Sequence, residues 1–269
     1  MKVVAVGDNM LDFYSNLQKK YLGGNAINFI MNLQQDTAFH LSYVGPIASD
    51  KAGIKLMSTL KENSVDINYS NVIEGNTPLS TVEVKDGERA FNGLEMGVLE
   101  GFYIDNHQIE FIKGHSHIHT SIMGGIINQL KDIHGYSSIS FDFSILRNKR
   151  IITEALKYID YAFYSGTRFE KEEEDMLLEA CSFGARHAVF LQGKVGSRVY
   201  DGNKLYFHSA EKGRVIDTLG AGDSFIAGYM SVILKGGSIK QAMEIGTQWA
   251  FKTCSHHGGF LINGAPVEV

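Results

Sequence analysis

One glycine-rich stretch contains the residue types that phosphoryl transfer requires. It runs from Asp217 to Asp223 (DTLGAGD), and the apolar spacing that follows predicts a helix beginning near Gly220. Because free backbone N–H groups and the helix dipole attract anions, this helix start could bind a phosphate. Asp223, in the first turn, would repel a phosphate but could take a proton from a hydroxyl that attacks phosphorus. The alternative is a glycine-rich turn in which Asp223 only caps the helix.

A second cluster of polar residues and glycines lies near the N-terminus. The run Lys2–Gly7 is short, apolar and β-branched, which predicts a buried parallel strand. Asp12 comes just past the carboxyl end of this strand, where open α/β sheets bind their ligands. Asp12 is therefore a candidate ligand-binding residue, and its alternative role is that of a solvated acid in a turn.

Histidines are grouped at two places in the chain. His115, His117 and His119 alternate on a predicted strand, so all three share one face. Tetrahedral zinc sites usually recruit ligands from more than one element, and no second cluster lies nearby in the sequence. We therefore favour a strand end near a substrate cleft, with His119 in reach of substrate. The pair His256-His257 comes just before Gly258-Gly259 and is assigned to a loop.

Strand and helix patterns alternate through most of the chain. Apolar runs predict strands at 2–7, 41–45, 116–121, 138–143, 159–164 and 187–192, then a hairpin of 197–200 and 205–208. Helical spacing predicts helices at 24–35, 50–63 (with Asp50 as N-cap), 105–113, 124–133, 148–157, 170–182, 220–235 and 238–254. Such repeated units imply the α/β class, with a doubly wound, mainly parallel sheet that helices cover on both faces.

The stretch from about residue 68 to residue 97 departs from this rhythm. An alternating run leads to Asp86-Gly87, which offers a hairpin turn, and a second run resumes at Arg89. Phe13–Leu17 could add a further strand. No linker surrounds this insertion, so we expect a single domain over residues 1–269 with a small β-sheet lid. The lid segments are about 12–18 and 68–97.

Composition limits the classes of protein that this chain can be. Of its 269 residues, 44% are hydrophobic and 20% are charged, which is ordinary for a globular domain with a substantial core. The formal net charge is −5 and no long basic run occurs, so nucleic acid is not the expected partner. No apolar run is long enough for a membrane-spanning helix. Cys181 and Cys254 are the only cysteines, which suits a reducing, cytoplasmic location.

Several motifs resemble those of the ribokinase-like (PfkB-type) carbohydrate kinases. The stretch from Asp217 matches the family's D-T-x-G-A-G-D at every specified position. Gly7–Asp12 resembles the opening G-[DE]-x-x-x-D, and Tyr21–Asn28 resembles the first signature, a Gly-Gly turn before a helix. Gln192–Ser197 and Ala250–Gly259 resemble the turn and the loop on the nucleotide side. The resemblance covers essentially the whole chain and implies a ribokinase-like fold and an ATP-dependent sugar kinase.

The resemblance also implies roles for the matching residues. The catalytic set is Asp223 as base and the backbone N–H groups of Gly220, Ala221 and Gly222 as the anion hole. Asp12, Gly24 and Asn28 would hydrogen-bond sugar hydroxyls, and we add Gly23, Arg89 and His119 as candidate substrate contacts. Thr218 would line the nucleotide phosphates, with Gly193, Gly196, His257 and Gly258 as further cofactor contacts.

ATP and Mg²⁺ are the cofactors that this chemistry implies, because the charge of the phosphates must be neutralised. The family usually carries N-x-x-E after a central strand to help organise magnesium. Ser165 and Arg168 stand at those Asn and Glu positions here, so the metal ligands stay unassigned. Glu170, Glu172 and Glu173 lie nearby and are interpreted as a solvated helix face.

One branch of the family, the bacterial fructoselysine 6-kinases, is the most similar in its motifs. The shared features are the short length, GDNMLDFY, GGNAIN, DTLGAGDSFIAGY, FKTCSHHGGF and the missing N-x-x-E. This resemblance implies O6 of fructoselysine, a sugar attached to lysine, as the phosphoryl acceptor. The alternatives are a kinase of fructose, ribose or a nucleoside, or a non-catalytic sugar-binding homologue. Relatives also imply a homodimer formed through the lid.

Overall fold

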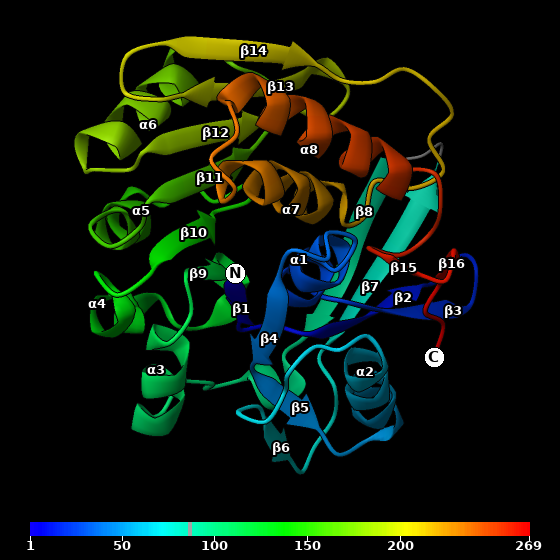
Figure 1. Cartoon of the computed structure of the whole chain (residues 1–269). Coiled ribbons are helices and arrows are strands. Elements are labelled where there is room, and N and C mark those ends of the chain that lie inside the picture. The colour runs from blue at the N-terminus through cyan, green and yellow to red at the C-terminus, as the bar shows by residue number, and fades with distance from the viewer. Residues whose placement is uncertain (86–87) are drawn as a thin grey trace.

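A central sheet of eight strands organises the chain in the computed structural model (Figure 1), in the order β14-β13-β12-β11-β10-β9-β1-β4. The structure describes the backbone of residues 1–85 and 88–269 and the side chains of residues 1–83 and 92–269. The strands are β1 Lys2–Val6, β4 His40–Val44, β9 His117–Ser121, β10 Ser138–Asp142, β11 Tyr161–Ser165, β12 His187–Leu191, β13 Gly196–Tyr200 and β14 Leu205–Ser209. Neighbours from β4 to β12 are parallel, and the β13–β14 hairpin is antiparallel. The predicted doubly wound, mainly parallel sheet is confirmed.

Helices cover both faces of this sheet (Figure 1). One face is covered by α1 Asn25–Leu33, α7 Ala221–Ile233 and α8 Ile239–Thr253, and the other by α3 Asn106–Lys113, α4 Leu130–Ile133, α5 Lys149–Leu156 and α6 Lys171–Ser182. Side chains of successive strand residues point to opposite faces, so Val3 and Ala5 join one core while Val4 and Val6 join the other. Among the described residues, no helix combines the length and the apolar composition that crossing a membrane would require.

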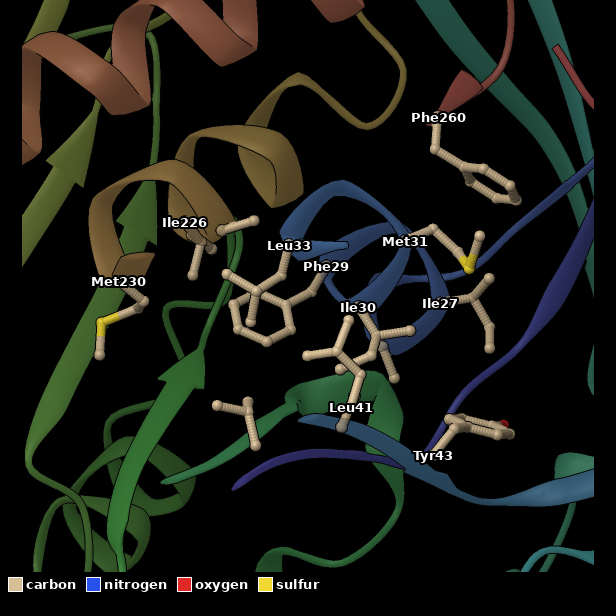
Figure 2. Packing of buried hydrophobic residues seen from close by; sticks show 14 of the residues in the cluster. Ile27, Phe29, Ile30, Met31, Leu33, Leu41, Tyr43, Ile226, Met230 and Phe260 are labelled. Atoms are coloured by element: carbon tan, nitrogen blue, oxygen red, sulfur yellow. The ribbon is translucent and has the colours of Figure 1, made fainter. Parts of the chain in front are cut away.

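The packing of α1 against α7 and β4 brings two helix starts together. Figure 2 shows Phe29 and Leu33 of α1 beside Ile226 of α7, and Ile30 above Leu41 of β4. Each large apolar side chain buried in this way contributes about 1.5–3 kcal/mol to folding. The first turns of α1 and α7 are therefore held next to each other over the sheet.

A second sheet of four strands lies beside the central one, in the order β3-β2-β7-β8 (Figure 1). Its strands are β2 Met10–Tyr14, β3 Lys19–Gly23, β7 Leu79–Lys85 and β8 Glu88–Glu95. The turn expected at Asp86-Gly87 lies outside the described residues. The remaining short strands are β5 Pro46–Ala48, paired with β6 Asn71–Ile73, and β15 Leu261–Ile262, paired with β16 Ala265–Pro266.

The strand expected at Phe13–Leu17 was misplaced. It begins earlier, at Met10, because β2 pairs with β3 on one side and with β7 on the other. It ends at Tyr14 because the chain turns back through residues 15–18, where Gln18 adopts a positive φ of 54°. Asp12 consequently lies inside this strand and is buried, rather than in a turn after the first strand.

Most of the expected helices are present, and one predicted helix is wrong. The helix expected at 50–63 is α2 Lys51–Glu62. Asp50 caps α2 as predicted, because its carboxylate accepts a hydrogen bond from the Gly53 N–H at 2.8 Å. The helix expected at 124–133 is replaced by two 3₁₀ turns, Ile122–Gly124 and Ile127–Gln129, and the short α4. Gly125, with a φ of 75°, ends the first turn in a left-handed conformation that an α-helix does not contain. Two other 3₁₀ turns are Gly97–Leu99 and Gly193–Val195.

His117 and His119 lie inside the core, where hydroxyl groups of β10 contact both nitrogens of His117 and Nδ1 of His119. Among the described residues, His119 Nε2 has no hydrogen-bond partner. His117 contacts the Ser138 and Ser140 hydroxyls at 2.8 and 2.9 Å, and His119 Nδ1 contacts the Ser140 hydroxyl at 2.8 Å. Burial lowers the pKa of His117 to about 3. Burial, together with the neighbouring His117, lowers the pKa of His119. Both imidazoles are therefore neutral in the folded protein.

We expect these histidines to make the protein unstable in mild acid. An unfolded histidine titrates near about pH 6.5, so protonation below that pH favours the unfolded chain. The stability is present above this pH and is lost as the pH falls toward the folded pKa of His117, about 3. Wild type should lose about 2 kcal/mol more unfolding free energy than His117→Gln between pH 7 and pH 5. Urea unfolding at both pH values measures this difference, and equal losses in the two proteins would contradict it.

Candidate active site

Several backbone N–H groups lie close together at the start of α7. Gly220 is the N-cap residue and has a φ of 73°, and a Cβ there would overlap the backbone of Gly259. The Ala221 N–H donates to the Thr218 carbonyl at 3.3 Å, which closes the turn. The N–H groups of a first helical turn point along the axis out of the helix, so this end is suited to bind an anion.

Asp223 faces the start of α1 and not the hydrophobic interior. Its side chain is 7% exposed. Asn25 Nδ2 donates to Asp223 Oδ1 at 2.8 Å, and Asn28 Nδ2 donates to Asp223 Oδ2 at 2.8 Å. The carboxylate is thus held by two amides at the point where the first turns of α1 and α7 meet.

The Asn25 amide joins Asp223 to a second carboxylate. Its Nδ2 also donates to Asp142 Oδ2 at 3.0 Å, and Asp142 Oδ1 accepts from the Ser144 N–H at 2.8 Å. Asp142 is the last residue of β10. Sequence reasoning missed both Asn25 and Asp142. A usable signal existed for Asp142, which ends a predicted parallel strand, where such sheets bind ligands.

Asp8 supports this arrangement from the end of β1. Asp8 Oδ2 accepts from the Asn25 N–H at 2.7 Å, and the Ser121 hydroxyl donates to Asp8 Oδ1 at 3.3 Å. Burial raises the pKa of the Asp8 carboxyl, and these hydrogen bonds oppose that rise. Asp8 therefore caps α1 from outside the helix and fixes the residue that contacts Asp223.

The predicted sugar-binding residues Asp12, Gly23, Gly24 and Asn28 are brought together. A Cβ at Gly23 would overlap Asp12 Oδ2 and would lie 3.7 Å from Asn28 Oδ1. Gly24 has a φ of 101°, and a Cβ there would lie 2.8 Å from the Asn9 Cα. Asn28 Oδ1 is buried and has no hydrogen-bond partner among the described residues. This acceptor and the Asp12 carboxylate lie close enough together to bind neighbouring hydroxyl groups.

Because the resemblance implies that Asp12 binds the sugar, Gly23→Ala is expected to weaken sugar binding and to leave ATP binding unchanged. The added methyl group must displace the Asp12 carboxylate, which costs a hydrogen bond to a charged group and about 10–100-fold in affinity. KM values for the sugar and for ATP, measured separately, test this expectation. Gly93→Ala in the same sheet is the matched control, because its Cβ would meet Thr81 at an ordinary 3.8 Å. Equal sugar KM values in the two variants would refute the assignment of Asp12.

The residues predicted for the nucleotide side lie around the other flank of the α7 start. The Cβ position of Gly222 lies 3.8 Å from Leu191, the last residue of β12, and the turn with Gly193 and Gly196 follows directly. Gly196 has a φ of 127° and its position is crowded by the backbone of β14, so only glycine fits there.

Thr218, His257 and Gly258 lie on the same flank of α7. Thr218 lies in the turn that precedes α7. His257 Nδ1 lies 3.8 Å from Asp217 Oδ2, and Gly258 immediately precedes the glycine against which Gly220 packs. The loop after α8 and the turn before α7 are therefore in contact.

Two of the predicted substrate contacts are not placed at this site. His119 is 0% exposed and its ring stacks on Phe29 at 3.9 Å between centroids, so it belongs to the core under α1. The alternation of β9 correctly put His119 on one face with His117, but that face is covered by a helix and not by a cleft. The side chain of Arg89 lies outside the described residues.

Among the described residues that follow β11, no acidic pair takes the place of the missing N-x-x-E. Arg147 Nη2 donates to the Ser165 carbonyl at 2.8 Å, so a guanidinium lies at this strand end. Glu170 and Glu173 form the capping box of α6 instead. Within the part of the chain that the structure describes, no group of three or more His, Cys, Asp or Glu side chains could hold a metal ion. Asp142 and Asp223, joined through Asn25, remain as a pair of oxygen donors.

Comparisons with known proteins agree on one family. A model described as pfkB family carbohydrate kinase matches residues 2–263. The chain is 31% identical to fructosamine kinase FrlD of Bacillus subtilis, over 97% of this chain and 93% of that protein. It is 30% identical to fructoselysine 6-kinase of Escherichia coli, over 97% of this chain and 100% of that protein.

Solved structures with the same fold include two kinases. A putative ribokinase II of Escherichia coli in complex with ATP and Mg²⁺ has a TM-score of 0.82 at 15% identity, covering 96% of this chain and 94% of that one. A nucleoside kinase of Methanocaldococcus jannaschii has a TM-score of 0.76 at 20% identity, covering 98% of this chain and 94% of that one. At these identities the likeness concerns the fold.

Proposed function

Because the chain belongs to the pfkB family of carbohydrate kinases, we propose that it transfers the γ-phosphoryl group of ATP to O6 of fructoselysine. The ATP-dependent sugar kinase class and the family that the motifs implied are confirmed. The observation that carries the substrate is the identity of 30–31% to fructosamine and fructoselysine kinases over 97% of the chain. The substrate and the residue roles below are parts of the proposal.

Asp223 is the base of this mechanism. It takes the proton of O6 while the oxygen attacks the γ-phosphorus and the bond from that phosphorus to the leaving oxygen of ADP breaks. The amides of Asn25 and Asn28 support this role, because they fix both carboxylate oxygens. Asp12 and Asn28 Oδ1 orient the sugar so that O6 lies next to Asp223.

The start of α7 stabilises the charge of the phosphoryl group during transfer. The backbone N–H groups of Gly220, Ala221 and Gly222 form the anion hole, and one such donor is typically worth about 10²–10³ in kcat. Gly193, Gly196 and Thr218 contact the nucleotide on the flank nearest β12, and His257 and Gly258 contact it from the loop after α8. The position of Gly222 supports this arrangement, since a Cβ there would lie 3.8 Å from Leu191 and the two segments are therefore close together.

Mg²⁺ would be held by the Asp142 carboxylate together with the ATP phosphates and water. Magnesium typically uses one or two carboxylates, waters and substrate phosphates, and this donor set fits that pattern. When bound, the ion neutralises phosphate charge. Asp142 is the chain's own contribution, because Asp223 is engaged with the acceptor hydroxyl.

Asp142→Asn should raise the Mg²⁺ concentration that nucleotide binding requires by about 10–100-fold, the usual effect of weakening a metal site. Calorimetry of a non-hydrolysable ATP analogue at increasing Mg²⁺ measures this without turnover. Asp201→Asn is the matched control, since Asp201 Oδ1 also accepts a backbone N–H two residues on, from Asn203 at 2.9 Å. An unchanged Mg²⁺ requirement in Asp142→Asn would remove this residue from the metal site.

The four-stranded sheet is proposed as the lid of a single kinase domain, residues 1–269. This lid excludes water when substrates are bound.

The outer strand of the lid sheet, β8, has one edge that is unpaired among the described residues, and Leu94 on that strand is 52% exposed. An exposed edge favours pairing, so we propose a homodimer through the lid. A molar mass of one chain in light scattering at working concentration would contradict the dimer. We also propose a cytoplasmic location, where Cys181 and Cys254 stay reduced.

A substrate panel tests the proposed acceptor. ADP release is measured with fructoselysine, fructose, ribose and adenosine at equal concentrations, with Asp223→Asn as the blank. Fructoselysine should give the highest kcat/KM, and NMR of the product should place the phosphate on O6. A higher kcat/KM with any of the other three acceptors would replace the proposed substrate. Binding of sugars without any ADP release would contradict the mechanism.

A further inference from the structure

The hydroxyl of Tyr14 lies where three distant segments meet. It donates to Asp217 Oδ2 and accepts from the Gly258 N–H at 3.1 Å. Tyr14 is the last residue of the lid strand β2, Asp217 begins the glycine-rich stretch, and Gly258 lies in the loop after α8. One phenol therefore connects the lid sheet, the turn before α7 and the C-terminal loop.

The hydroxyl of Tyr14 is shielded from solvent. Tyr14 and Asp217 are both 0% exposed. The Tyr14 ring packs with Tyr21, Val82 and Leu219 in a small apolar cluster. Burial above all, and next the charge of Asp217, raises the pKa of Tyr14, so the phenol stays protonated and donates. A hydrogen bond to a buried carboxylate is among the stronger ones in proteins and is costly to lose.

Both partners of the phenol lead directly to the start of α7. Asp217 Oδ1 accepts from the Leu219 N–H at 2.9 Å, which shapes the turn just before Gly220. Gly258 is followed by Gly259, whose backbone is packed against Gly220. The position of Gly220 is thus set from two sides, and Tyr14 is bonded to both.

The sugar side is connected through the same strand. Asp12 and Tyr14 are two residues apart on β2, so their side chains leave the same face of the lid sheet. Movement of β2 that carries Asp12 toward or away from a sugar would also pull on Asp217 and Gly258. Both residues belong to the same stretch of β2 that pairs with β7, where Asp12 pairs with Ser80 and Tyr14 pairs with Val82.

We propose that Tyr14 is a positioning residue that couples the lid to the anion hole: its hydroxyl holds the turn before α7 and the Gly258 loop in register with the strand that carries Asp12. The inference rests on the proposed function in one respect, that the N–H groups of Gly220–Gly222 bind the moving phosphoryl group. It adds a residue that touches neither substrate.

Tyr14→Phe isolates the hydroxyl, because the ring remains to fill the cluster with Tyr21 and Leu219. We expect kcat to fall about 10–100-fold, as for a small displacement of a catalytic group, with KM for ATP and sugar within about threefold. Binding of Mg²⁺-ADP should be unchanged, but the gain in affinity on adding aluminium fluoride, which imitates the phosphoryl group, should fall about tenfold or more. The matched control is Tyr206→Phe, which removes a phenol that donates to Asp201 Oδ2 at 3.1 Å away from the site.

Each outcome of this experiment is decisive for Tyr14. Wild-type kcat and a wild-type fluoride effect in Tyr14→Phe would overturn the inference, as would a lower melting temperature with unchanged kcat, since that is a purely structural role. The fluoride measurement needs no sugar. If wild type shows no activity with fructoselysine, that result contradicts the proposed substrate and leaves the role of Tyr14 to be decided by the fluoride measurement. A wild type that gains no affinity from fluoride overturns the anion hole and this inference together.

Discussion

Asp223→Asn is expected to lower kcat by roughly 10²–10⁴-fold, the usual contribution of a general base. An asparagine amide has the same size as the carboxylate but cannot accept a proton at neutral pH. Asn25 and Asn28 each donate to the native carboxylate, and only one of them can keep an acceptor oxygen in the variant. The variant should therefore fold, with a loss of about 1–3 kcal/mol in stability.

The measurement must separate the lost base from the disturbed network. Steady-state kinetics give kcat, and calorimetry should find Mg²⁺-ATP and sugar affinities close to those of wild type. Asn25→Ala serves as the comparison, because it removes one hydrogen bond from Asp223 and leaves the carboxylate in place. Its loss in kcat should be smaller, about tenfold. Near-full turnover in Asp223→Asn would remove this residue from the mechanism.

Gly220→Ala is expected to lower kcat by about 10²–10³-fold, which corresponds to the loss of an anion-hole donor. The residue has a φ of 73°, and its added Cβ would overlap the Gly259 backbone. Since backbone cannot swing aside as a side chain can, the turn and the first N–H groups of α7 must move. The displacement acts on the groups that would bind the phosphoryl oxygens.

Gly236→Ala is the matched control at the other end of α7. Gly236 has a φ of 80°, and a Cβ there would have no atom of the described residues within 4 Å. The control carries the same left-handed strain, about 1–2 kcal/mol, without the steric overlap. Melting temperatures should fall in both variants, whereas only Gly220→Ala should lose kcat. Equal kcat in the two variants would move the anion hole away from this turn.

Local patterns explain the parts of the fold that could be predicted. The β-branched run Lys2–Gly7 and the capped helix after Asp50 depend on residues within one or two turns of each other, and both are present. The glycines before Asp223 likewise predict a helix start, because their effect on the backbone is local. The strand at Met10–Tyr14 was misplaced because its bounds depend on pairing with Leu79–Lys85, far along the chain.

Local sequence patterns could not predict which residues surround each side chain in the folded protein. The period of β9 places His117 and His119 on one face, but whether that face meets a cleft or a helix depends on how α1 packs, and here Phe29 covers His119. Asn25 looked like an ordinary residue of a Gly-Gly turn until α7 was placed beside it. Contacts of this kind join residues far apart in sequence, as with the 198 positions between Asn25 and Asp223.

The amino-acid sequence alone determined the α/β architecture and the helix start at Gly220, because periodicity, capping and glycine conformation act over a few residues. The kinase family followed from the resemblance of the motifs to those of known kinases. Tertiary structure alone decided which side chains form hydrogen bonds with each other. The Asn25 amide donates to both Asp142 and Asp223, and the Tyr14 hydroxyl donates to Asp217, 203 positions along the chain. The physical reason is that packing of α1 and α7 over the central sheet, and of the four-stranded sheet against the turn before α7, sets these distances.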